Sequence, residues 1–228
     1  MFGSHQNHIH YFRTLKGVVG MLRDPEHTES VFDIEDGLRD IDATRHMLEH
    51  LRKDDDVAAM IDSRWLAPDT HDDMDRLQAM PVGTLGRTFA DHIASHGFDP
   101  DYYRRLPVTD DATYVMMRIR QTHDIWHCIT GFDVDRVGEI ALKAFELAQL
   151  RRPMAAVICA GGVMRFLLKT PDELDDCLRA ISWGYRTGLG ARPLLAHRFE
   201  EQWERPLAEW RAMLDVDPER HDPDRMRA

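Results

Sequence analysis

The chain has 228 residues, of which 43% are hydrophobic and 30% are charged, proportions typical of a globular protein with a buried core. They exclude a chain that is disordered throughout. The 29 basic and 40 acidic residues give a formal net charge of −11, which a phosphate backbone would repel, so nucleic acid is not an expected partner.

Apolar residues recur at helical spacing along nearly the whole chain, and no segment shows sustained alternation bounded by hairpin turns. We therefore predict an all-α fold, in which residues 1–228 form a single domain built as a multi-helix bundle. The expected helices, in chain order, are 9–22, 34–53, 72–79, 84–96, 111–130, 134–151, 153–168, 172–189 and 194–214.

Several helix boundaries have a local cause. Asp110 is expected to cap helix 111–130, and Gly131 supplies a left-handed residue that ends it. Asp133 is expected to cap the following helix. The segment from Asp215 onward is charged and poor in apolar residues, so we expect a frayed tail.

The cellular compartment is inferred from the cysteines, the first residues and the longest uncharged stretch. Its three cysteines are odd in number and widely separated, so neither a disulfide framework nor a thiolate zinc site is expected. Residues 1–12 are polar rather than signal-like. The longest uncharged stretch, 153–164, is shorter than the roughly 20 residues that span a bilayer. A cytoplasmic protein without a membrane-spanning helix is expected.

Three pairs of histidines lie four residues apart, a spacing that places both on one helix face. With 13 histidines, chance alone produces nearly one such pair, so the spacing by itself proves little. The pairs are His46/His50, His92/His96 and His123/His127.

Only His123 and His127 have further support. They lie at the edge of the apolar stripe of helix 111–130, so they are expected to face inward. Two buried imidazoles beside Asp124 need partners, and a metal ion would satisfy all of them at once. The alternative is a pair of ordinary core histidines.

Glu139 is the candidate third ligand. If helix 134–151 returns antiparallel after the turn at 131–133, Glu139 is level with the gap between the two histidines. Two histidines and one carboxylate suit zinc or non-haem iron, with Asp124 as a fourth ligand or as an anchor for one. Glu139 also lies opposite the apolar stripe of its helix, where it could simply pair with Lys143. The residues alone leave both possibilities open.

The stretch HDIWHCITGFDVDRVGE, which begins at His123 and ends at Glu139, resembles the zinc motif proposed for the ubiquinone-biosynthesis family known as coenzyme Q biosynthesis protein four. The resemblance extends over about residues 72–214 and includes PVGTLGRTFADHI at 81–93, ALKAFE at 141–146 and EQWERPLAEWR at 201–211. It implies an all-helical protein whose metal is held by His123, Asp124, His127 and Glu139. Zinc is the first candidate, with iron or another divalent metal as the alternative.

The function that the resemblance implies is removal of the ring carboxylate of a 4-hydroxy-3-methoxy-5-polyprenylbenzoate, which leaves a methoxy-polyprenylphenol. Asp124 is the candidate to move the proton, and Tyr114 and Arg118 are weaker candidates for the substrate pocket. The implied partners are the polyprenylated benzoate or a quinone intermediate, other ubiquinone-biosynthesis proteins, the inner face of a membrane bound peripherally, and a second copy in a homodimer.

Two other functions compete. The chain could be a non-catalytic, lipid-binding scaffold for other quinone-pathway proteins, with Gly161 and Gly162 admitting a polyprenyl chain, although close helix packing explains these glycines better. It could also be a His-Asp phosphohydrolase, because His-Asp doublets occur at 71–72, 123–124 and 221–222. The histidine and glutamate that follow the second doublet, His127 and Glu139, favour the metal-dependent decarboxylase over the phosphohydrolase.

Overall fold

The structure is a computed structural model that describes residues 38, 41–68, 73–100, 102 and 105–220. Within these residues the regular secondary structure is helical, apart from one isolated bridge between Thr84 and Pro206, so the predicted all-α fold is confirmed. The contacts divide the chain into two compact units. The first unit is Met1–His50 with Asp135–Leu189, and the second is Leu51–Val134 with Gly190–Ala228. The single domain stays a prediction.

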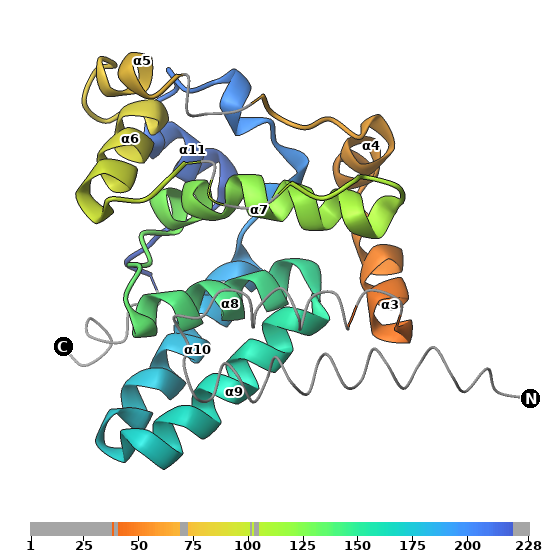
Figure 1. Cartoon of the computed structure of the whole chain (residues 1–228), viewed down its shortest axis with the longest axis vertical. Coiled ribbons are helices and arrows are strands. Elements are labelled where there is room, and N and C mark those ends of the chain that lie inside the picture. Colours follow the sequence, from red (N-terminus) through yellow and green to blue (C-terminus); the bar gives the residue numbers. More distant parts are fainter. Residues whose placement is uncertain (1–37, 39–40, 69–72, 101, 103–104, 221–228) are drawn as a thin grey trace, which may run out of the picture. The chain divides into compact units, whose positions relative to one another are not determined.

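The second unit contains α7 (Asp111–Thr130), against which three other helices of that unit pack. These are α4 (Asp55–Ser63), α6 (Leu85–His96) and α11 (Leu207–Leu214), as Figure 1 shows. The unit also contains α5 (Met74–Gln78) and two short 3-10 helices, η3 (Leu194–Ala196) and η4 (Phe199–Glu201). Helix α7 is therefore the element on which the side chains of this unit converge.

Both ends of α7 lie where the sequence places them. The Asp110 carboxylate accepts a hydrogen bond from the Thr113 backbone N–H (2.8 Å), and the Thr113 hydroxyl accepts one from the Asp110 backbone N–H (3.0 Å), which completes a capping box. At the other end Gly131 has φ 74°, a left-handed conformation that glycine adopts without strain. These two signals fix the register of the histidines within the helix.

The first unit contains α3 (Asp42–Leu51, whose last residue belongs to the second unit), α8 (Arg136–Leu150), α9 (Pro153–Lys169), η2 (Pro171–Glu173) and α10 (Leu174–Gly190). Glycines let α9 and α10 approach α8 closely. A Cβ at Gly162 would lie 2.1 Å from Ile140 Cδ1, and one at Gly184 would lie 1.9 Å from the Ala141 carbonyl oxygen. Helix packing therefore accounts for Gly162.

The prediction of one continuous helix over 194–214 is wrong. That segment holds η3, η4 and α11 instead, and between them the chain pairs with the start of α6. The backbone N–H groups of Leu85 and Gly86 donate to the carbonyl oxygens of Arg205 and Trp203, each at 2.9 Å. Carbonyl groups used in this way cannot accept helical hydrogen bonds, so a long-range contact overrides the local helical pattern.

Two other local expectations need correction. Helix α4 was missed, although the Asp54 carboxylate caps it by accepting from the Asp56 and Val57 N–H groups. Helix α8 is capped by Asp135, whose carboxylate accepts from Gly138 N–H (2.7 Å), and not by Asp133, whose carboxylate accepts from Val134 N–H (2.7 Å) just before the helix.

The remaining expectations concern the ends of the chain. The expected helix 9–22 and the start of the helix 34–53 lie outside the described residues, as does the tail beyond residue 220. Val216, within the tail expected to be frayed, is buried, so packed structure continues past Asp215. Among the described residues, no helix is both long enough and apolar enough to cross a membrane.

Candidate metal centre

His123 and His127 lie one turn apart on α7, and both side chains face inward as expected. Only 8% of His123 and 2% of His127 is exposed. Their rings meet edge to face, with 4.8 Å between the ring centroids. Two buried imidazoles in this arrangement provide two nitrogen donors on one face of one helix, which is a common basis for a metal site.

The orientation of His127 is set by a backbone group just beyond its own helix. Its Nδ1 donates a hydrogen bond to the Phe132 carbonyl oxygen at 2.9 Å. In the neutral ring, this bond places the hydrogen on Nδ1 and leaves on Nε2 the lone pair that a metal requires. Histidines that bind metals usually donate their second nitrogen to a carbonyl or carboxylate in this way.

Asp124 follows His123 on α7, and its carboxylate faces α6. Asp124 Oδ1 lies 3.9 Å from His92 Nε2, and the side chains are 17% and 14% exposed. Burial acts to raise the pKa of Asp124, but the His92 side chain and the positive charge of the surrounding histidines outweigh it, so the pKa lies below its ordinary value. Asp124 is therefore a carboxylate, not a carboxylic acid, at neutral pH.

His92 of α6 lies at this site, although its spacing from His96 proved little by itself. The His92 ring stacks on the His127 ring at 5.8 Å between centroids and with 22° between planes. His96 lies next to His92, with 4.9 Å between their centroids. The i,i+4 spacing is visible in the sequence, but the packing of α6 on α7 is not. The one signal that could have separated His92 from His96 is that His92 lies within the family-like stretch 81–93.

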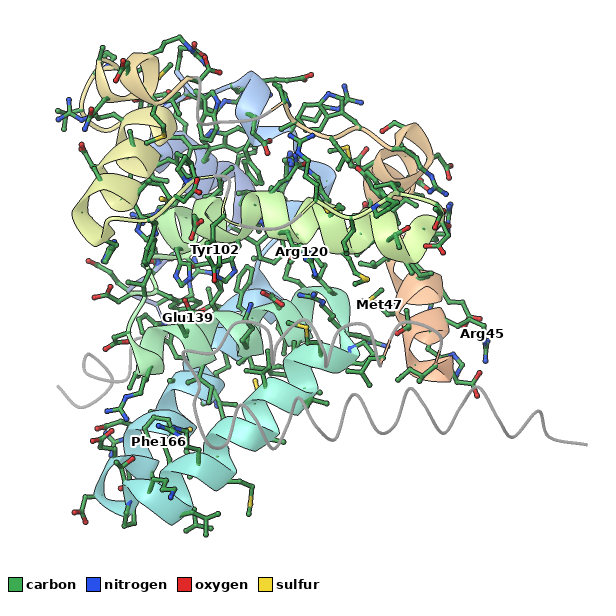
Figure 2. All side chains as sticks on the ribbon, viewed as in Figure 1. Arg45, Met47, Tyr102, Arg120, Glu139 and Phe166 are labelled. Atoms are coloured by element: carbon green, nitrogen blue, oxygen red, sulfur yellow. The ribbon has the colours of Figure 1, made fainter. Side chains whose placement is uncertain are left out.

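Glu139 lies in the first turn of α8, where its backbone N–H donates to the Asp135 carbonyl oxygen at 2.9 Å. Its side chain is half-buried and is labelled in Figure 2. Lys143, the alternative partner expected for Glu139, forms an ion pair with Glu146. Glu139 belongs to the first unit, whereas His123 and His127 belong to the second. Its role as a ligand is therefore part of the proposal below.

Tyr114 and Arg118, the weaker candidates, are fully buried on the first half of α7. The Tyr114 hydroxyl donates to the Trp65 carbonyl oxygen at 3.0 Å. The Arg118 guanidinium binds both carboxylate oxygens of Glu200 and donates to the His197 carbonyl oxygen. These partners give both side chains a structural role in the second unit, and their role in substrate binding stays a prediction.

The remaining donors nearby fit a nitrogen and oxygen site better than a thiolate one. Cys128 adjoins His127 in the sequence and is a buried free thiol. Burial, followed by the negative charge of Asp124, raises its pKa to about 12. The groups available for a metal are thus imidazoles and carboxylates, which suits zinc with an open position or non-haem iron.

Comparison with known proteins shows which family the chain resembles. Residues 11–219 match the model of the family described as coenzyme Q (ubiquinone) biosynthesis protein Coq4. The chain is 38% identical over 148 residues to the mitochondrial ubiquinone biosynthesis protein COQ4 of Eremothecium gossypii, which covers 63% of this chain and 45% of that protein. It is 27% identical over 181 residues to the mitochondrial COQ4 homologue of Aedes aegypti, which covers 78% of this chain and 65% of that protein.

A solved structure is also similar. A proposed ubiquinone biosynthesis protein from Nostoc punctiforme superposes with a TM-score of 0.81 at 32% identity, covering 91% of this chain and 98% of that one. The fold thus has an experimental counterpart along nearly its full length. The chain spans about half the length of the fungal relatives that it matches.

Proposed function

Since the chain belongs to the coenzyme Q (ubiquinone) biosynthesis protein Coq4 family, we propose that it acts in ubiquinone biosynthesis as a metal-dependent decarboxylase. The proposed substrate is a 4-hydroxy-3-methoxy-5-polyprenylbenzoate, and the products are CO2 and the corresponding methoxy-polyprenylphenol. The observation that carries the proposal is the buried His123/His127 pair, in which His127 Nδ1 is hydrogen-bonded to a backbone carbonyl, so that Nε2 is the ring nitrogen available to a metal.

We propose that His123, His127 and Glu139 hold the metal. Together these side chains offer two imidazoles and a carboxylate, a donor set that could hold a divalent ion. Glu139 lies 12 residues after His127, and the five residues 131–135 join the two helices, so the connection keeps it within reach of the pair. Bound there, zinc or iron would polarise the substrate carboxylate or phenolate.

The residues of this chain have distinct tasks in the proposed reaction. The C1–carboxylate bond breaks, CO2 leaves, and its bonding electrons stay on the ring carbon, which then takes a proton. Asp124 is the carboxylate placed beside the histidines, and it either moves this proton or serves as a fourth ligand. The two roles predict different consequences for the metal when the carboxylate is changed to an amide.

Asp124→Asn separates these roles. If Asp124 moves the proton, the variant keeps its metal and CO2 release falls by about 10²–10⁴-fold. If Asp124 is a ligand, metal content and activity fall together. The measurements are elemental analysis of protein purified without chelators and release of labelled CO2 from the carboxyl-labelled polyprenylated benzoate. A variant that keeps both the metal and full activity would remove Asp124 from the mechanism.

A non-catalytic scaffold is the second candidate, since a four-ligand protein site would leave no position for substrate. Wild-type protein that binds metal and polyprenylated benzoate but releases no CO2 would favour it. Release of phosphate from a nucleotide would instead favour the His-Asp phosphohydrolase reading. Two of the three His-Asp doublets that suggest a phosphohydrolase, at 71–72 and 221–222, lie outside the described residues.

We further propose that the protein associates peripherally with a membrane through apolar contact. The end of α9 exposes Met164, Leu167 and Leu168, which are 47%, 49% and 65% exposed. A net charge of −11 disfavours binding to an anionic surface through charge. Liposome flotation should therefore be insensitive to salt and weakened in a Leu167→Ser/Leu168→Ser variant. Loss of binding at high salt would contradict the apolar mode.

A further inference from the structure

We propose that His92 of α6 is a positioning residue of the metal centre, which holds the Asp124 carboxylate and the His127 ring in place from the neighbouring helix. The proposal deepens the proposed function and rests on it, because the groups that His92 orients are those assigned to the metal and the proton. His92 is 31 residues from His123 and outside the motif that indicated the site.

The contact with Asp124 has a defined direction. His92 Nε2 lies 3.9 Å from Asp124 Oδ1. A carboxylate only accepts hydrogen bonds, so any hydrogen bond between these two groups is donated by His92 Nε2–H, whether or not the ring is charged. The Nε2 atom is buried and, among the described residues, has no partner at hydrogen-bond distance. Closing this 3.9 Å separation to hydrogen-bond distance would give the buried Nε2 atom a partner.

The contact with His127 uses the face of the same ring. The two rings are nearly parallel, 22° apart, with centroids separated by 5.8 Å. The edge of the Phe98 ring contacts His92 at 6.1 Å between centroids. The Nδ1 hydrogen bond to Phe132 fixes one edge of the His127 ring, and the stacked His92 ring restrains its face. A ring held at two places presents Nε2 in one direction.

Helix α6 holds His92 firmly because both of its ends are capped. The Thr84 hydroxyl accepts from the Arg87 N–H at 3.2 Å at the start, and Gly97 takes the left-handed conformation, with φ 65°, at the end. The helix also packs against α7. The position of His92 relative to Asp124 is therefore set by two rigid elements of the same unit.

His96, one turn further along α6, provides a matched control. Its Nδ1 donates to the His92 carbonyl oxygen within the same helix at 2.9 Å. Its Nε2 lies 4.0 Å from Asp133, whose side chain is 75% exposed. His96 thus has the same residue type and helix as His92, but its charged neighbour is a solvent-exposed carboxylate rather than Asp124.

The test uses the full chain loaded with Co²⁺, whose visible absorption reports the geometry around the ion. His92→Met and His92→Gln are close in size, but only Gln retains an N–H donor near the position of Nε2. We expect His92→Met to lower the Co²⁺ affinity, measured by competition with a chelator, by about 10–100-fold and to change the spectrum. His92→Gln should recover most of the loss, and His96→Met should match wild type.

The outcomes are distinguishable. If wild-type protein binds no Co²⁺, the proposed metal function fails, and the positioning role fails with it. If wild type binds Co²⁺ but His92→Met has the affinity and spectrum of His96→Met, the positioning role alone is overturned. Urea unfolding checks that each variant folds, and if His92→Met does not fold, His92→Phe, which keeps a ring and lacks the donor, is compared with His92→Gln instead.

Discussion

The two halves of α7 bury polar side chains in different ways. In the first half, Arg118 is fully buried, binds both oxygens of Glu200 and stacks over Trp65 at 4.9 Å. In the second half, His123 and His127 lie against each other and beside Asp124. A saturated buried ion pair fixes packing, whereas neighbouring imidazoles and a carboxylate are the types of group that bind a metal. The first half is therefore expected to control stability and the second half metal binding.

The largest expected effect is on metal binding in the second half. His127→Ala removes the imidazole whose Nδ1 is held by Phe132, so the protein should lose its ion, since a ligand contributes more than the about 10–100-fold carried by its supporting groups. Elemental analysis should find about one divalent ion per chain in wild type and none in the variant.

His46→Ala is the matched control for His127→Ala. His46 also belongs to a pair spaced four residues apart, but its side chain is 62% exposed. Its variant should keep the wild-type metal content. A His127→Ala protein that is folded by circular dichroism and still holds one ion per chain would break the assignment of the second half of α7.

The next largest effect is on stability in the first half. Arg118→Ala leaves the Glu200 side chain, only 7% exposed, without its guanidinium partner, which should cost about 3–5 kcal/mol of unfolding free energy. Urea unfolding measures this loss. The metal content of the folded protein should be unchanged.

A double variant checks that the cost comes from an unpaired charge. Replacing both partners, as in Arg118→Met/Glu200→Leu, removes the buried charge together with its partner, so much of the lost stability should return. Equal destabilisation of the single and double variants would instead assign the cost to packing around Trp65 and the His197 carbonyl oxygen.

A smaller effect is expected at the end of α7. Gly131 has φ 74°, and a Cβ there would lie 3.2 Å from Pro218 Cβ. Gly131→Ala should cost about 1–2 kcal/mol for the left-handed conformation and also weaken metal binding, because the next residue, Phe132, orients His127. Gly97→Ala has the same strain, φ 65°, with no atom within 4 Å of the new Cβ, so its loss of unfolding free energy measures the cost of the left-handed conformation without a steric contact.

The sequence predicted α7 to the residue because both of its end signals are local. Asp110 caps the helix and Gly131 ends it whatever the rest of the chain does. The segment 194–214 failed for the opposite reason, because residues 203 and 205 pair with residues 85 and 86, more than 100 residues earlier. Hydrophobic periodicity carries no information about such a partner.

The candidate site also has a part that local sequence predicts and a part that depends on long-range packing. His123, Asp124 and His127 share one arc of one helix, so their proximity follows from helical geometry. His92 reaches Asp124 only because α6 packs on α7. The i,i+4 spacing of His92 and His96 could not distinguish them from the exposed His46, since a spacing reports a shared helix face but not what that face contacts.

The smallest expected effect is a pH dependence of stability through His197, whose carbonyl oxygen accepts a hydrogen bond from Arg118 in the first half of α7. Its ring lies 5.8 Å from Phe199 and 5.7 Å from Trp210. Burial lowers its pKa below the ordinary 6.5, and this outweighs the opposing charge of Asp56. Below about pH 6.5 the unfolded chain therefore takes up a proton at His197 more readily than the folded protein does. The unfolding free energy consequently falls as the pH falls. Above that pH the ring is neutral in both states, so His197 adds no pH dependence. The urea midpoint should drop less between about pH 7.5 and 5.5 in His197→Gln than in wild type, and parallel curves for the two proteins would show that His197 is not the group responsible.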